Sequence, residues 1–146
     1  MRVVIDANVF LSYLIRSQQP TAVVRLVTHV IGGDFVLVLP DGVREEMRLA
    51  VREKPYFRER IEMAVLEDFL ALIAEVAVLP DAGAVSVTVS RDAKDQYLLD
   101  AAASDGVDFL ITGDKDLLDI GGESNIPLIV TAAQFLQLVD TEPGNL

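Results

Sequence analysis

The stretch Leu110-Ile-Thr-Gly-Asp-Lys-Asp-Leu-Leu118 joins an apolar run to two acidic residues, Asp114 and Asp116, that are one position apart. The apolar run predicts a buried strand, and the acids come where that strand ends. In open α/β folds, ligands bind at the rim of the sheet, just beyond the carboxyl ends of the strands. The stretch therefore predicts a sheet that delivers carboxylates to a ligand-binding rim.

Strand and helix patterns alternate along the rest of the chain. Short apolar runs bounded by turn residues predict strands at residues 3–5, 35–39, 76–79, 107–112 and 127–130. Apolar residues at helical spacing predict helices at residues 9–15, 20–31, 42–52, 91–104, 114–118 and 131–138. Residues 56–74 fit one long helix or a helical pair, and residues 84–89 fit an edge strand or an extended connector.

This alternation predicts an α/β fold of three layers, α/β/α, with a central parallel sheet of about five strands. The length of 146 residues and the hydrophobic content of 51% fit one domain with its own core. Residues 1–140 are expected to form this single domain and residues 141–146 a flexible C-terminal tail. Asp41 is expected to cap the helix at 42–52.

Composition limits the chemistry that the chain can perform. The sequence has no Cys and one His, His29, which excludes disulfides, thiolate metal sites and thiol nucleophiles. A serine-type triad would depend on His29 alone, and we interpret this histidine as structural because it lies within an expected helix. Catalysis must therefore rest on oxygen ligands and carboxylates.

Net charge and hydropathy restrict the partners. The formal charge of −11 argues against broad surfaces that follow nucleic-acid phosphates. Any contact with a nucleic acid has to be local, bridged by metal or assisted by a few cations. No apolar run approaches the roughly 18 residues that a membrane span needs. We therefore expect a cytoplasmic protein with no membrane partner.

Two acids lie on or beside the inward faces of expected helices. In the helix at 42–52, Glu46 borders the apolar stripe, whereas Glu45 points nearly the opposite way at about 100° per residue. Asp95 lies within about 40° of Leu99, on the apolar face of its own helix. A carboxylate without a partner is costly there. The plainer interpretation, that Asp95 only caps the helix, stays open.

Asp6 ends the strand at 3–5 in the same way that Asp114 ends the strand at 107–112. If these strands are neighbours at a topological switch point, the acids Asp6, Glu46, Asp95, Asp114 and Asp116 can converge. Such a cluster repels itself unless a hard divalent cation compensates it, and Mg²⁺ and Mn²⁺ prefer carboxylate and water oxygens. A bound metal of this kind activates water and neutralises charge developing on a phosphate. This is the chemistry of phosphodiester hydrolysis.

The residues that carry this chemistry also carry a resemblance. They are Val4-Ile-Asp-Ala-Asn-Val9, the acidic helix after the second strand, Arg91-Asp-Ala-Lys-Asp95 and Leu110-Ile-Thr-Gly-Asp-Lys-Asp-Leu-Leu118. In order and spacing, over essentially the whole chain, they resemble the PIN-domain family. More closely, they resemble the small bacterial PIN proteins, related to VapC, that form the toxin component of toxin–antitoxin systems. The resemblance implies a PIN-like fold and a metal-dependent endoribonuclease that uses Mg²⁺ or Mn²⁺.

By position, the resemblance also assigns site residues. It places the four catalytic and metal-binding acids, and a frequent fifth metal ligand, at Asp6, Glu46, Asp95, Asp114 and Asp116. Asn8 and Thr112 match polar positions that support such a site. The chain departs from the commonest pattern with Ala93 in place of Pro and Gln96 in place of a second Asp. Neither departure removes one of these acids.

The implied partners are an RNA substrate, a cognate antitoxin protein and a second copy of the chain in a homodimer. The cations that could contact single-stranded RNA near the rim are Arg44, Arg48, Arg91, Lys94 and Lys115. Each of them could equally be an ordinary surface charge. With no Trp and 6% aromatic residues, the sequence shows no obvious platform for stacking bases.

Three other interpretations compete with this one. Asp6-Ala-Asn8 and Gly113-Asp-Lys-Asp116 also resemble the opening and late acidic motifs of HAD-type phosphomonoester hydrolases, but Asn8 cannot serve as the acid that this chemistry requires. A calcium loop at 114–119 has Leu118 at its fifth position and lacks the glycine at its sixth. A catalytically silent PIN scaffold that acts by binding a partner predicts lost acids, and none is missing.

Overall fold

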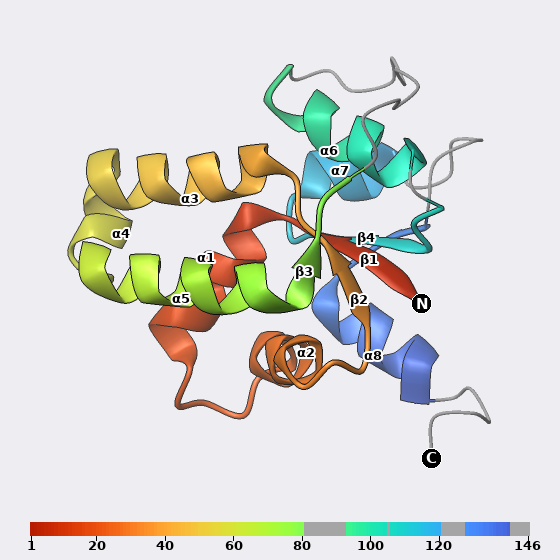
Figure 1. Cartoon of the computed structure of the whole chain (residues 1–146), viewed down its shortest axis with the longest axis horizontal. Coiled ribbons are helices and arrows are strands. Elements are labelled where there is room, and N and C mark those ends of the chain that lie inside the picture. The colour runs from red at the N-terminus through yellow and green to blue at the C-terminus, as the bar shows by residue number, and fades with distance from the viewer. Residues whose placement is uncertain (81–92, 105, 121–127, 141–146) are drawn as a thin grey trace.

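The computed structural model describes residues 1–80, 93–104, 106–120 and 128–140 of the chain (Figure 1). Within them, five strands form one parallel sheet in the order β3-β2-β1-β4-β5. The strands are β1 (Arg2–Ile5), β2 (Val36–Val38), β3 (Ala77–Val78), β4 (Phe109–Ile111) and β5 (Leu128–Val130). The helices are α1 (Ala7–Arg16), α2 (Ala22–Ile31), α3 (Asp41–Glu53), α4 (Pro55–Arg58), α5 (Met63–Val76), α6 (Ala93–Ser104), α7 (Lys115–Ile120) and α8 (Ala132–Asp140). The predicted α/β fold with a parallel sheet of about five strands is confirmed.

Strand β1 lies in the middle of the sheet. Its residues Val3, Val4 and Ile5 are fully buried and β-branched, as expected for a strand that is covered on both faces. β1 pairs with β2 on one side and with β4 on the other. Because the chain runs outward through β2 and β3 before it returns to β4 and β5, the boundary between β1 and β4 is a topological switch point. The two strands that end in Asp6 and Asp114 are therefore neighbours, which is the condition under which the sequence allowed the acids to converge.

Helices cover both sides of the sheet. Figure 1 shows α6 and α7 on one side and α2 and α8 on the other, which gives the three layers. On the second side, the fully buried ring of Phe135 in α8 meets the rings of Phe35 and Phe109 edge-on, with centroids 5.0 and 5.1 Å apart. Edge-to-face packing is a favoured arrangement of aromatic rings, and it holds α8 against the sheet.

Helices α3, α4 and α5 form a helical arm, residues 41–76, that extends from one end of the sheet (Figure 1). Pro55 is the first residue of α4, where its fixed φ and missing N–H suit a helix start. Residues 56–74 therefore belong to a helical pair and not to one long helix. Arg48 of α3 donates to both carboxylate oxygens of Glu67 in α5, at 2.7 Å from Nε and 3.1 Å from Nη2. This fork ties the two long helices of the arm together.

Two local predictions differ from the structure. Asp41 is the first residue of α3 and makes no capping hydrogen bond, because its carboxylate accepts from the guanidinium of Arg44 instead. The third strand is confined to Ala77–Val78, since Val76 still belongs to α5. Helix α5 thus extends two residues beyond the predicted end of the helical segment at residue 74.

Some predictions fall on parts of the chain that the structure does not describe. They concern the segment 84–89 and the tail at 141–146. The extent of the single domain, residues 1–140, stays a prediction. None of the helices in the described ranges is long and apolar enough to cross a membrane.

Candidate active site

Asp6 occupies the rim of the sheet at the switch point. It lies between the last residue of β1 and the first residue of α1, and its backbone N–H still donates to the carbonyl oxygen of Ile111 in β4 at 2.9 Å. Only 3% of the residue is exposed. A carboxylate is seldom buried to this degree without a partner. Here the partner is Thr112, whose Oγ1 donates to Asp6 Oδ2 at 2.7 Å.

Thr112 connects the two acids that end β1 and β4. It is fully buried, and its backbone N–H continues the pairing with β5 by donating to Val130. Besides donating to Asp6, its hydroxyl oxygen accepts from the backbone N–H of Asp114 at 3.0 Å. Asp114 Oδ1 in turn accepts from the N–H of Asp116 at 2.9 Å, which caps the first turn of α7. One threonine thus fixes both strand-end acids relative to the sheet.

The pKa of Asp6 is raised above its ordinary value of 3.8. Burial is the main cause, because desolvation disfavours the charged carboxylate. The hydroxyl of Thr112 and the backbone N–H groups of Ala7 and Asn8 oppose the rise, whereas the negative charge of Asp114 adds to it. Ionisation of Asp6 is therefore unfavourable in this environment, and a nearby positive charge would make it more favourable.

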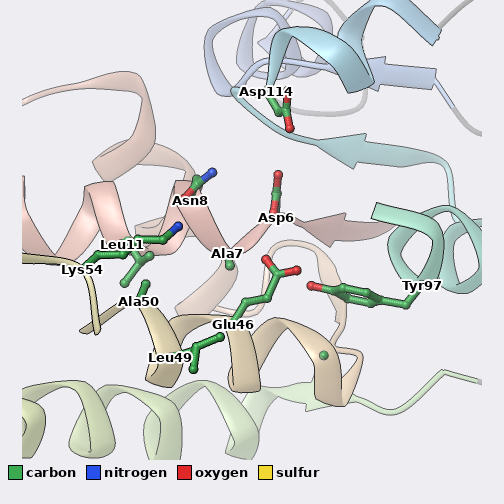
Figure 2. A pocket seen from close by; sticks show the side chains of 11 residues that line it. Asp6, Ala7, Asn8, Leu11, Glu46, Leu49, Ala50, Lys54, Tyr97 and Asp114 are labelled. Atoms are coloured by element: carbon green, nitrogen blue, oxygen red, sulfur yellow. The ribbon is translucent and has the colours of Figure 1, made fainter. Parts of the chain in front are cut away.

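A pocket of about 440 Å³ opens beside Asp6. It is lined by Asp6, Ala7, Asn8, Leu11, Gly42, Glu46, Leu49, Ala50, Lys54, Tyr97 and Asp114. In Figure 2, the carboxylates of Asp6 and Asp114 point toward each other, and the carboxylate of Glu46 points from α3 toward Asp6. Acids from the ends of two strands and from one helix therefore converge on the same space.

The two adjacent glutamates of α3 have different surroundings. Glu46 is half-buried and lines the pocket. Glu45 is exposed, and one of its carboxylate oxygens accepts from Arg48 at 3.3 Å. The two side chains therefore lie where the helical spacing predicted, with Glu46 toward the rim of the sheet and Glu45 away from it.

Gly42 and Tyr97 are pocket residues that the sequence did not single out. A Cβ added to Gly42 would lie only 2.7 to 2.8 Å from three ring carbons of Tyr97. The missing side chain therefore lets the ring from α6 pack against the first turn of α3. In Figure 2, the hydroxyl of Tyr97 is directed toward Glu46. No sequence pattern reveals this contact, because it depends on where two helices distant in the chain meet.

Lys54 is another pocket residue that the sequence did not single out. It lies between α3 and α4, and Figure 2 shows it beside Leu11 and Ala50, on the opposite side of the pocket from Tyr97. Its only sequence signal is its position just before Pro55, which does not indicate a binding role. The pocket thus has acids at one side and a cation at the other.

The candidate cations for RNA contact do not share one setting in the structure. Arg44 and Arg48 are both paired with acids of the helical arm. Lys115 is exposed at the first residue of α7 and does not line the pocket. The side chains of Arg91 and Lys94 lie outside the part of the chain that the structure describes.

Two of the predicted metal ligands lie elsewhere or are not described. Asp116 is exposed in the first turn of α7 and is not a lining residue of the pocket. Asp95 belongs to the first turn of α6, the helix that brings Tyr97 to the pocket, but its side chain lies outside the described residues. Among the side chains that are described, no three acids or histidines are grouped closely enough to hold a metal ion.

The donor set nevertheless fits a hard divalent cation. Asp6 and Asp114 offer facing carboxylate oxygens, Asp6 is desolvated, and its neighbour's negative charge opposes its ionisation. Mg²⁺ and Mn²⁺ prefer oxygen ligands, and their charge offsets the repulsion between neighbouring carboxylates. Both ions retain water ligands where the protein supplies few. The facing carboxylates of Asp6 and Asp114 therefore fit a hard divalent cation.

Comparison with family models identifies the fold. A model described as the PIN domain matches residues 2–116, from β1 into α7. The chain belongs to the PIN-domain family. Comparisons with curated proteins and with solved structures gave no match. PIN domains are generally nucleases, so this membership gives the chain a nuclease-type fold. The family match thus favours the resemblance to PIN domains over the resemblance to HAD-type hydrolases.

The raised pKa of Asp6 predicts how stability depends on pH in the absence of metal. The folded chain binds a proton at Asp6 more readily than the unfolded chain does, and this proton binding stabilises the fold. The contribution to the free energy of unfolding is greatest below the ordinary pKa of 3.8. It is lost as the pH rises through the pKa that Asp6 has in the folded chain. Asp6→Asn removes the charge and keeps an oxygen for Thr112. In chelator, we expect this variant to unfold at a higher urea concentration than the wild type at pH 7, with the gain shrinking toward zero near pH 3.

Asp68→Asn is the matched control, because it removes an exposed carboxylate from α5. This variant should show little of the pH-dependent gain in stability to urea that we expect for Asp6→Asn. A wild-type chain at least as stable as Asp6→Asn at pH 7, or a gain that does not change with pH, would show that the carboxylate of Asp6 carries no desolvation cost.

Proposed function

We propose that this protein is a metal-dependent endoribonuclease that hydrolyses phosphodiester bonds of single-stranded RNA in the cytoplasm. The observation that carries the proposal is the buried carboxylate of Asp6, which faces Asp114 across a pocket at the switch point of a PIN-family sheet. Ligands of open α/β folds bind at this point, and carboxylates grouped there suit the chemistry of phosphates.

The proposed ligands of Mg²⁺ or Mn²⁺ are Asp6, Glu46, Asp95, Asp114 and Asp116. When bound, the metal would activate water and neutralise charge that develops on the phosphate. Thr112 holds the carboxylate of Asp6 in one orientation through its 2.7 Å hydrogen bond. Asn8, exposed at the second position of α1, offers its amide to the substrate or to ordered water.

Among the residues that the structure describes, none that lines the pocket is Cys, Ser, Thr or His. The pocket therefore offers no serine-, threonine- or cysteine-type nucleophile and no histidine base. His29 is engaged elsewhere, because its Nδ1 lies 2.7 Å from a carboxylate oxygen of Asp34. Asn8 stands where the HAD-type mechanism requires an acid, so the phosphomonoesterase alternative lacks its proton donor.

The adjacent glutamates of α3 give a sharp test of this proposal. With Mg²⁺ or Mn²⁺ and a labelled single-stranded RNA, we expect Asp6→Asn and Glu46→Gln to lower the cleavage rate by about 100-fold or more, since several kcal/mol of charge stabilisation would be lost. Asp95→Asn should have a similar effect. Glu45→Gln, the matched control, should cleave at nearly the wild-type rate because Glu45 faces away from the pocket.

Four outcomes would reject the proposal. One is metal-dependent cleavage that survives in folded Asp6→Asn and Glu46→Gln proteins. Another is equal loss in Glu45→Gln and Glu46→Gln. The third is turnover of a generic phosphomonoester by a wild-type protein that leaves RNA intact, which would favour the phosphatase alternative. A protein that cleaves neither substrate but binds a partner would be a silent PIN scaffold.

We further propose that the protein is the toxin of a toxin–antitoxin pair, with a cognate antitoxin and a homodimeric form. Family membership and the resemblance of the four sequence segments to bacterial PIN toxins support this proposal. Induced expression of the wild type should arrest bacterial growth, whereas Asp6→Asn should not. Co-expression of a small protein encoded beside it should relieve the arrest. Equal growth with both forms would contradict the toxin role.

A further inference from the structure

A second cavity adjoins the acidic pocket. It measures about 200 Å³ and is lined by Asn8, Ser12, Ile15, Arg16, Tyr56 and Phe57. Asn8 also lines the acidic pocket, so the two hollows meet at this residue. The two adjoining hollows are together called the α1 groove.

One wall of the α1 groove is a single face of α1. The residues Asn8, Ser12, Ile15 and Arg16 are spaced by four, three and one positions, so they lie on one side of the helix. At about 1.5 Å per residue, the wall from Asn8 to Arg16 is about 12 Å long. Because stacked nucleotides of a single strand advance about 3.4 Å each, this length accommodates about three of them.

The opposite wall presents an aromatic ring that is held in place. Tyr56, in α4, is 49% exposed. The guanidinium of Arg60 lies 4.0 Å from the centroid of its ring, and Nη1 of Arg60 donates to the Tyr56 carbonyl oxygen at 2.9 Å. Phe57 meets the ring edge-on at 5.2 Å with an interplanar angle of 88°. These contacts orient the ring before any ligand binds, which lowers the entropy lost when a base stacks on it.

The sign of the charge changes along the α1 groove. The acidic pocket holds Asp6, Glu46 and Asp114, with Lys54 at its side. Among the described residues that line the second cavity, Arg16 is charged and none is an acid. Each hollow thus has one cation, Lys54 or Arg16, and Tyr56 lines the second hollow with Arg16. Cations beside an aromatic ring match the combination of phosphate contacts and stacking that binds single-stranded nucleic acid.

We propose that the α1 groove binds single-stranded RNA, with a base stacked on Tyr56 and the adjoining phosphates contacted by Lys54 and Arg16. The strand enters the acidic pocket past Asn8, which places one phosphodiester bond beside Asp6. This proposal rests on the proposed ribonuclease function, whose site it extends. It assigns substrate binding to residues of α1, of α4 and of the junction between α3 and α4, and not to the predicted cations Arg44 and Arg48.

The test measures affinity without cleavage. A labelled single-stranded RNA of about ten nucleotides is titrated with the full-length protein in chelator, and fluorescence anisotropy gives the Kd. Tyr56→Ala should weaken binding about 5- to 150-fold, the usual range for loss of one base–aromatic stack, whereas Tyr56→Phe should bind like the wild type. Arg25→Gln, on the exposed side of α2, is the control for loss of one positive charge.

Salt dependence separates phosphate contacts from structural effects. Each phosphate contact with a single strand adds about 0.7 to the slope of log affinity against log salt concentration. Lys54→Gln and Arg16→Gln should each lower the magnitude of this slope by about 0.7, while Arg25→Gln should leave it unchanged. Thermal unfolding of each variant shows that the fold is intact.

The possible results distinguish the groove from the ribonuclease. If Tyr56→Ala, Lys54→Gln and Arg16→Gln all bind like Arg25→Gln while the wild type still cleaves RNA, the α1 groove is wrong and the catalytic proposal stands. A wild type that binds no single-stranded RNA in chelator also overturns the groove. If the predicted losses in affinity are found but no variant or condition gives metal-dependent cleavage, the groove is supported and the ribonuclease proposal fails.

Discussion

The hydrogen bond from Thr112 to Asp6 is the contact on which the candidate site depends. It joins the residues that follow β1 and β4, and it holds a carboxylate that is only 3% exposed. Burial of this carboxylate is unfavourable, so the surrounding sheet must supply the stability that keeps it there. The buried residues of β1 and the parallel pairing with β4 do so. The site is thus built into the centre of the fold and not added at its surface.

The helical arm complements this rigid centre. α3 brings Glu46 toward Asp6, the junction between α3 and α4 brings Lys54, and α4 brings Tyr56 to the adjoining cavity. The fork between Arg48 and Glu67 joins α3 to α5 and so supports the position of all three. Asp6 and Asp114 are therefore supplied at the end of the sheet and Glu46 by the arm, while the groups suited to binding a substrate come from the arm and from α1. Chemistry and binding would then be separable by mutation.

The sequence predicted those parts of the site that local patterns determine. Apolar strands that end in acids placed Asp6 and Asp114 at one rim, and helical phase turned Glu46 inward. It could not predict that Tyr97 packs over Gly42, because that contact depends on how two distant helices cross. Arg44 and Arg48 were candidates for RNA contact, but the sequence could not predict that the fold pairs them with acids, since the partner of a surface charge is set by packing and not by sequence spacing. The ligand role of the predicted acids stays a prediction.

The most direct test of this account is a crystal structure of the protein with Mn²⁺, in which anomalous scattering locates the ion. We expect a manganese peak between the carboxylates of Asp6 and Asp114, within bonding distance of an oxygen from each, and none there in Asp6→Asn crystals. Manganese bound only at other acids, or at Asp114 without Asp6, would contradict the claim that the buried carboxylate at the centre of the sheet is the metal-binding group of this PIN domain.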